Sequence, residues 1–99
     1  MSTTADKIEI ENFTSPKWRG NVDRAKYEAM RDALLSVLPT FAPGLSVADA
    51  KAKLLPLLPE EIFPDGAKAG WWLKAAQLDL EAKGIIIREA SKPLRLHRK

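Results

Sequence analysis

The chain has 99 residues, 45% of them hydrophobic, which suits one domain with a modest core and is too short for two. It contains no cysteine, and this excludes zinc fingers, disulfide scaffolds and thiol catalysis. The net charge of +3 is unevenly distributed. Residues 1–65 carry 8 Lys/Arg and 10 Asp/Glu, whereas residues 66–99 carry 8 and 3, so the two parts have net charges of −2 and +5. A basic last third favours a polyanion-binding surface, or alternatively a basic tail that maintains solubility.

The N-terminal region is predicted to contain little regular structure. Residues 1–6 are small and polar, which predicts disorder, and they lack the basic and apolar blocks of a signal peptide. No apolar run reaches the roughly 20 residues needed to span a bilayer, so we expect a soluble cytoplasmic protein without a membrane partner. Charged residues and isoleucines alternate from Lys7 to Glu11, which indicates a half-buried strand or an extended arm. Residues Thr14 to Asn21 include a proline and a glycine and are predicted to be a linker.

The first helix is predicted to begin after Asn21 or Asp23, because either side chain can accept a hydrogen bond from an N–H of the first turn. It should stop before Pro39, which has no N–H and restricts the residue before it. Apolar residues recur along it at steps of three and four and form one stripe: Tyr27, Met30, Leu34, Val37 and Leu38.

A turn at Pro43 and Gly44 separates this helix from a second one, for which Ser46 is the predicted N-cap. Pro56 should kink or end the second helix. Its apolar positions are Val47, Ala50, Leu54 and Leu57 or Leu58. The loop that follows, Pro59 to Pro64, should insert two large apolar side chains into the core: Ile62 and Phe63.

The third helix is predicted to be capped by Asp65 and to run to about Lys83. Gly84 should end it, because glycine readily adopts the left-handed conformation found after many helices. Residues 85–87 are three isoleucines, and β-branched residues favour a strand. A turn at 90–93 and alternation at 94–97 then predict a returning edge strand.

The predicted order is therefore helix, helix, helix and hairpin, with a candidate strand in front. This order describes a mainly α fold of the α+β class with a small β-hairpin. We expect one domain over residues 7–98.

Two resemblances support this fold. The segment from Leu80 to Arg88 places a leucine four residues before a glycine and aliphatic residues after it. It resembles the joint between recognition helix and wing in bacterial winged helix-turn-helix regulators, and Pro93 to Leu96 resembles the second wing strand. The resemblance implies three helices plus a C-terminal wing. The chain is also similar to a small uncharacterised bacterial family in three motifs, Tyr27–Met30, Gly70–Trp72 and Pro93–Arg95, which implies a fold without supplying a function.

Successive residues of an α-helix lie about 100° apart around its axis. With this spacing, the predicted third helix has two apolar faces. The core face is predicted to hold Ala69, Leu73, Ala76 and Leu80, and the nearly opposite face holds Trp71, Ala75, Leu78 and Ala82. Three interpretations of the second face compete. An N-terminal arm could cover it through Ile8, Ile10, Phe13 or Trp18. It could instead form a homodimer or partner interface. Direct contact with nucleic acid is the least favoured, because aromatic stacking belongs mainly to single strands.

The leading functional hypothesis is a small winged-helix module, with a regulatory role, that binds DNA weakly. A basic wing contacts phosphates, so it contributes affinity more than sequence choice. The predicted DNA-binding residues are Lys68 and Lys74 on the third helix, and Arg88, Lys92, Arg95 and Arg98 on the wing. The alternative hypothesis is a protein-interaction or homodimerisation module without nucleic-acid binding, which would use the face of Trp71, Ala75 and Leu78.

An enzyme is not expected. His97 is the only histidine, no serine lies in a nucleophile-elbow pattern, and the glycines at 66 and 70 do not form a phosphate loop. The adjacent carboxylates Glu60 and Glu61 are expected to be solvated or to cap a helix. The sequence therefore predicts no catalytic residue, no metal site and no cofactor.

Overall fold

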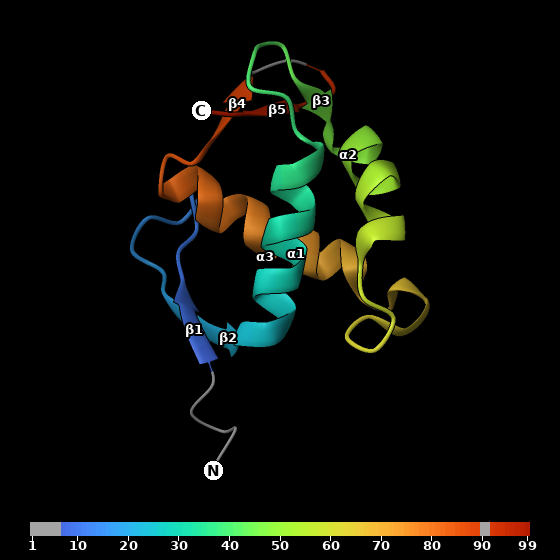
Figure 1. Cartoon of the computed structure of the whole chain (residues 1–99). Coiled ribbons are helices and arrows are strands. Elements are labelled where there is room, and N and C mark those ends of the chain that lie inside the picture. The colour runs from blue at the N-terminus through green and yellow to red at the C-terminus, as the bar shows by residue number, and fades with distance from the viewer. Residues whose placement is uncertain (1–6, 90–91) are drawn as a thin grey trace.

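The computed structural model describes residues 7–89 and 92–99, which form an α+β fold with three α-helices and two small antiparallel sheets (Figure 1). Residues 1–6, predicted to be disordered, and positions 90 and 91 of the predicted wing turn lie outside the described residues. The elements in chain order are β1 (Lys7–Ile10), β2 (Gly20–Asp23), α1 (Arg24–Val37), β3 (Leu45–Ser46), α2 (Val47–Leu54), the 3-10 turns η1 (Leu55–Leu57) and η2 (Pro64–Gly66), α3 (Ala69–Ala82), β4 (Ile86–Glu89) and β5 (Arg95–Arg98).

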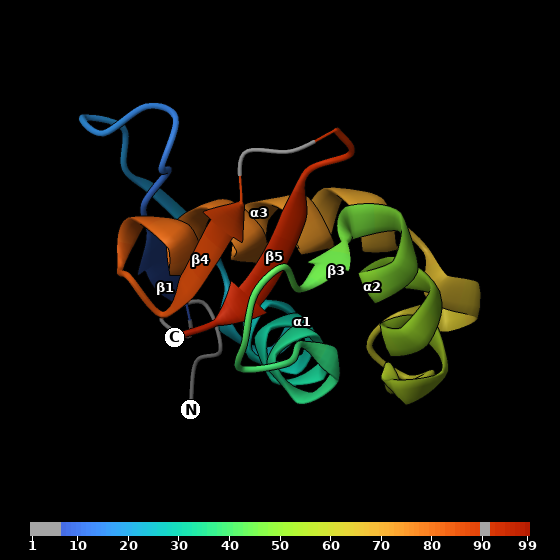
Figure 2. The same cartoon turned by 90° about the horizontal axis from the view of Figure 1, so that it is seen from above.

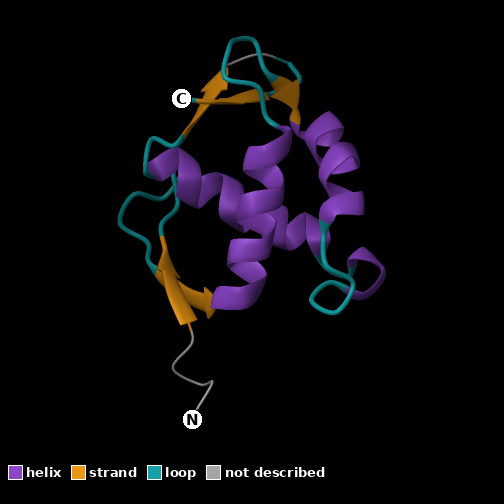
Figure 3. Cartoon of the chain, viewed as in Figure 1, coloured by secondary structure: helices purple, strands orange, loops and turns teal. Residues whose placement is uncertain are grey.

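The helices occupy the middle of the molecule, and the two sheets lie at opposite ends of it (Figure 3). Helices α1 and α3 pack against each other across the centre. The core is built from their facing side chains, with contributions from α2 and both sheets. Its largest fully buried members include Tyr27, Phe63, Met30, Leu34, Leu54, Leu80, Ile86 and Leu96.

The predicted N-terminal strand is confirmed as β1, but the prediction of a linker up to Asn21 is wrong at its end. Strand β2 begins at Gly20 and pairs with β1 in antiparallel register, with Ile10 opposite Gly20 and Ile8 opposite Val22. The sequence of β2 lacks a run of β-branched or aromatic residues, so no local pattern marks it as a strand. Its backbone hydrogen bonds to β1 determine its conformation instead.

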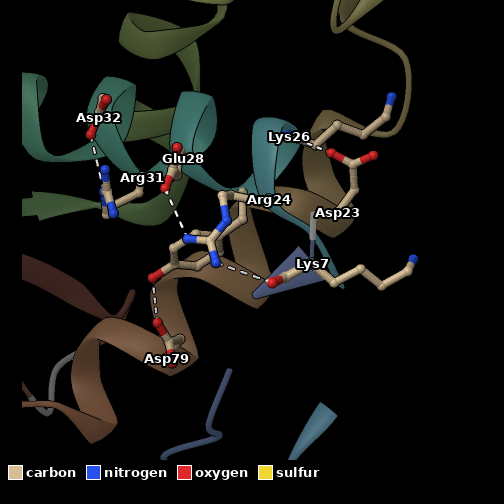
Figure 4. A network of polar contacts seen from close by, with 9 residues as sticks. Lys7, Asp23, Arg24, Lys26, Glu28, Arg31, Asp32 and Asp79 are labelled. Atoms are coloured by element: carbon tan, nitrogen blue, oxygen red, sulfur yellow. Dashed lines mark hydrogen bonds and ion pairs between the residues drawn. The ribbon is translucent and has the colours of Figure 1, made fainter. Parts of the chain in front are cut away.

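Helix α1 confirms one of the two predicted caps. The Asp23 carboxylate accepts a hydrogen bond from the Lys26 N–H at 3.1 Å (Figure 4). At the other end of the helix, the chain becomes extended at Leu38, before Pro39. Arg24 then joins the start of α1 to β1, because its guanidinium contacts Glu28 at 3.4 Å and the carbonyl of Lys7 at 3.2 Å (Figure 4).

Helix α2 begins as predicted, with the Ser46 hydroxyl accepting a hydrogen bond from the Asp49 N–H at 3.1 Å. It ends at Leu54, because Pro56 converts the next residues into a 3-10 turn. Leu57 consequently lies on the surface and not in the core, whereas Leu58 is half-buried. Phe63 is fully buried and Ile62 is half-buried, as expected for residues that insert into the core from a loop.

The start of α3 corrects the prediction that Asp65 caps it. Asp65 lies in a 3-10 turn with a φ of 53°, and its N–H donates to the Glu60 carboxylate. Lys68 also has a positive φ, of 60°, so α3 starts only at Ala69 and has no side-chain cap. Its C-terminus agrees with the prediction: Gly84 has a φ of 74°, and its N–H donates to the backbone carbonyl of Glu81.

The C-terminal hairpin is confirmed, and a short strand extends it. The sheet order is β3-β5-β4, with β5 in the middle (Figure 2). Strand β3 has only two residues, of which Leu45 pairs with Leu96, and so short a segment carries no periodicity from which to predict it. The sheet thereby links the connection between α1 and α2 to the end of the chain.

Candidate functional site

The outward face of α3 has an exposed first half and a covered second half. Gly70, Trp71 and Lys74 are exposed, and the Trp71 side chain retains 58% of its accessible surface. Every residue from Ala76 to Glu81 is buried. A helix that reads bases needs a row of accessible polar side chains, so only the first two turns of α3 are available to a partner.

The segment Glu11 to Phe13 covers the second half of α3. The Phe13 N–H donates to the Leu78 carbonyl at 3.1 Å, and the Glu11 N–H donates to the Asp79 carboxylate at 2.8 Å. The interpretation that an N-terminal arm covers the second apolar face is therefore confirmed for Leu78. Trp71, on the same face, stays exposed, and Ala75 is half-buried.

Asp79 connects the segment Glu11 to Phe13 to the core. Its fully buried carboxylate accepts hydrogen bonds from the Tyr27 hydroxyl of α1 and the Glu11 N–H, and forms an ion pair with Lys83 at 2.9 Å. Burial, followed by the hydrogen bond to Asp79, raises the pKa of Tyr27 well above its ordinary value. Tyr27 therefore remains protonated and donates to Asp79, which joins three segments at one carboxylate.

A cavity of about 480 Å³ lies between the β1–β2 hairpin and the first half of α3, and we call it the apolar groove. Its wall consists of apolar side chains, with a few polar residues at the margins. The apolar residues are Ile10, Trp18, Val22, Trp71, Ala75 and Leu78; the others are Glu11, Asn12, Gly20, Asn21, Gly70 and Lys74. The groove thus includes all three residues of the predicted partner face. Its opposite wall includes Ile10 and Trp18, two of the N-terminal residues that the sequence offered as cover for that face.

A second cavity of about 480 Å³ lies between α2, α3 and the C-terminal hairpin, and we call it the cationic groove. Three of its residues carry positive charge: Lys51, Lys74 and Arg88. The rest of the wall is Thr14, Val47, Gly70, Leu73, Gln77, Leu78 and Leu94, so none of the lining residues is a carboxylate. This groove brings together two of the six predicted DNA-binding residues, Lys74 and Arg88, and adds Lys51.

A protein-family model described as a family of unknown function (DUF6958) matches residues 7–96. The chain belongs to this family. This result agrees with the similarity to an uncharacterised family indicated by the motifs at 27–30, 70–72 and 93–95. No curated protein and no solved structure matches this DUF6958 chain.

Arg88 of this DUF6958 domain is already engaged within the molecule. Its Nε and Nη2 atoms donate to the two oxygens of Glu81 at 2.5 and 2.7 Å, and its guanidinium lies 4.8 Å from the centre of the Phe13 ring. The hydrogen bond to Glu81 raises the pKa of Arg88, so the residue stays charged. Glu81 offsets much of that charge locally, which leaves Lys51 and Lys74 as the principal cations of the groove.

The four other predicted DNA-binding residues lie outside the cationic groove. Arg95 donates to the Gly44 carbonyl and Arg98 to the Leu38 carbonyl, both at 3.0 Å, so these arginines attach β5 to the connection between α1 and α2. Lys68 and Lys92 are exposed, Lys68 before the start of α3 and Lys92 between β4 and β5. The sequence identified the charges but not the hydrogen bonds that already engage two of them.

Gln77 contributes a polar group to the cationic groove. Gln77 is 6% exposed and lines the groove. An amide in this position can donate a hydrogen bond to a ligand or to water. The sequence places Gln77 on the predicted third helix, four residues before Glu81. Without the position of α2, it does not show that Gln77 lines a groove.

Within the described part of the DUF6958 chain, no helix is both long and apolar enough to cross a bilayer. The same residues contain no group of three histidine, aspartate or glutamate side chains placed to hold a metal ion. The candidate functional sites are the two grooves beside α3.

Proposed function

We propose that the chain is a winged-helix module that binds duplex DNA weakly, through phosphate contacts in the cationic groove. The observation that carries this proposal is the placement of Lys51, Lys74 and Arg88 around one cavity whose wall contains no carboxylate. Glu81 offsets much of the charge of Arg88, so Lys51 and Lys74 are the principal cations of this cavity. Two lysines without a carboxylate beside them in the wall attract the phosphate backbone and release its counterions.

The arrangement of the elements supports the winged-helix part of the proposal. Three helices are followed by the β4–β5 hairpin, and this hairpin lies beside α3 in the place of a wing. The cationic groove is the space between α2, α3 and this hairpin. A nucleic-acid backbone that runs over the first turns of α3 would meet charges from all three elements.

The start of α3 supports phosphate binding in particular. The helix has no side-chain cap and no acidic residue in its first turn, so its first N–H groups and its dipole are available to an anion. Gly70 of the first turn lines the groove, and a Cβ at this position would lie 3.4 Å from the Lys51 ammonium. The Gln77 amide adds a neutral donor further along the groove.

Sequence-specific reading is not part of the proposal. Leu78 occupies the outward face of α3, and the backbone of Phe13 covers it. Contacts limited to phosphates contribute affinity with little preference between sequences. We therefore expect similar affinities for unrelated duplexes.

Fluorescence anisotropy with a labelled duplex of about 20 base pairs at low salt tests the proposal. The double variant Lys51→Gln/Lys74→Gln should bind at least about tenfold more weakly, because two phosphate contacts are lost. Lys53→Gln is the matched control, since Lys53 is an exposed lysine of α2 that does not line the groove. Absence of binding by the unmodified protein, or an equal loss in the control, would overturn the proposal.

A further inference from the structure

We infer that the apolar groove is a second binding site, and that it takes a small aromatic molecule bearing one carboxylate. This site goes beyond the proposed DNA contacts, because the N-terminal hairpin faces α3 across it, whereas α2 and the C-terminal hairpin face α3 across the cationic groove.

The size and wall of the groove indicate a small molecule. Its volume of about 480 Å³ falls in the range of roughly 300–1,000 Å³ that is usual for ligand pockets. Such pockets combine mostly apolar and aromatic walls with a few polar groups, and here six apolar side chains meet the amides of Asn12 and Asn21. One side chain of a partner protein would leave much of this volume empty.

Two tryptophans indicate an aromatic ligand. The side chains of Trp18 and Trp71 are 45% and 58% exposed, although both line the groove. Trp71 is held edge-to-face against the buried Trp72, with ring centres 4.9 Å apart. Trp18 lies over Gly20, where a Cβ would collide with its ring. Because both rings are held by their surroundings, they offer a planar ligand two surfaces at a low entropic cost.

The charge on the wall of the groove indicates an anionic ligand. Lys74 lines the groove and forms no ion pair with the described residues. Glu11 supplies the one carboxylate on the wall. Its backbone N–H donates to Asp79, which fixes Glu11 near that residue of α3. Asp79 is five residues beyond Lys74, about 7.5 Å along the helix axis. A carboxylate next to Lys74 is therefore separated from Glu11.

The probe for this site is naphthalene-2-carboxylate, titrated into the full-length, ¹⁵N-labelled protein. We expect the indole N–H resonances of Trp18 and Trp71 to shift along one saturable curve with one equivalent bound. Trp18→Ala and Trp71→Ala should each weaken binding about tenfold, as measured at the remaining tryptophan. Phe41→Ala is the control, because Phe41 is 68% exposed and does not line the groove, and it should not change the affinity.

The charge requirement is tested by a neutral analogue, 2-naphthylmethanol. Lys74→Gln should weaken binding of the carboxylate about threefold, the strength of an exposed ion pair, and leave binding of the alcohol unchanged. Lys51→Gln should affect neither ligand, which separates this site from the cationic groove. Shifts that do not saturate, or an equal loss of affinity in Phe41→Ala, would overturn the inference. A concentration-dependent dimer that shifts the same two resonances without the probe would also overturn it, because a second copy would then be the occupant.

Discussion

The two grooves beside α3 have similar volumes and share Gly70, Lys74 and Leu78, yet they differ in chemistry. One is closed by the inner face of the β1–β2 hairpin, which supplies isoleucine, valine and tryptophan. The other is closed by α2 and the C-terminal hairpin, which supply Lys51 and Arg88. The comparison shows that the elements packed beside an exposed helix, as much as the helix itself, determine what its surface can bind.

The grooves also depend on different internal contacts. The apolar groove depends on Asp79, which holds the segment after β1 against α3. The cationic groove depends on Glu81, which positions Arg88 and offsets its charge. Separate variants of Asp79 and Glu81 should therefore each change binding at one groove and leave the other groove intact.

The largest effect is expected for Asp79→Asn. The change removes the buried carboxylate that serves Tyr27, Lys83 and the Glu11 N–H, and should lower the free energy of unfolding by about 3 kcal/mol. Urea denaturation measures this loss. Naphthalene-2-carboxylate binding should fall with it, whereas DNA binding of the folded fraction should persist.

Asp32→Asn is the control for this variant. Asp32 is an exposed acid of α1 that pairs with Arg31 at 3.0 Å, and its change should shift the free energy of unfolding by less than about 0.5 kcal/mol. Equal stabilities of the Asp79 and Asp32 variants would show that the N-terminal segment is not held by Asp79.

Glu81→Gln is expected to have an intermediate effect on stability. Unlike Asp79→Asn, which should weaken ligand binding, it should strengthen DNA binding. The loss of this carboxylate leaves the Arg88 guanidinium without its counter-charge, so DNA affinity at low salt should rise about threefold. The same change should lower the free energy of unfolding by about 2 kcal/mol, because a well-buried charged hydrogen bond is lost. Glu28→Gln, which affects an ion pair on α1 instead, should leave DNA affinity unchanged.

The smallest effect is expected from His97 on β5. Its hydrogen bond to the Arg98 carbonyl, followed by the one to Glu89, raises the pKa of His97 above the ordinary 6.5. A raised folded-state pKa means that the stabilisation is complete below the unfolded pKa and is lost as the pH rises through the folded one. The thermal midpoint should therefore decline slightly as the pH rises above about 6.5, and His97→Gln should remove that part of the decline. A decline of the same size in the variant would assign it to other groups.

The sequence predicts those features of this fold that have local causes. Asp23, Ser46 and Gly84 mark helix ends through hydrogen bonds or backbone conformations of neighbouring residues, and all three are confirmed. Strands β2 and β3 were missed because their partners, β1 and β5, lie elsewhere in the chain.

The candidate sites were predictable to the extent that they belong to α3 and the C-terminal hairpin. Lys74 and Trp71 were identified there, but Lys51 and Trp18 come from elements whose positions the sequence does not give. Arg95 and Arg98 carry the charge of DNA-binding residues, and only the structure shows that they donate to the carbonyls of Gly44 and Leu38.

The most direct test of the cationic groove is the salt dependence of duplex binding. Each phosphate contact contributes about −0.9 to the slope of log affinity against log salt. Contacts from Lys51 and Lys74, the two cations of the groove that no acid offsets, predict a slope of about −1.8, and the Lys51→Gln/Lys74→Gln variant should lose most of this salt dependence. The same slope for both proteins would place the DNA contacts elsewhere and contradict the central claim.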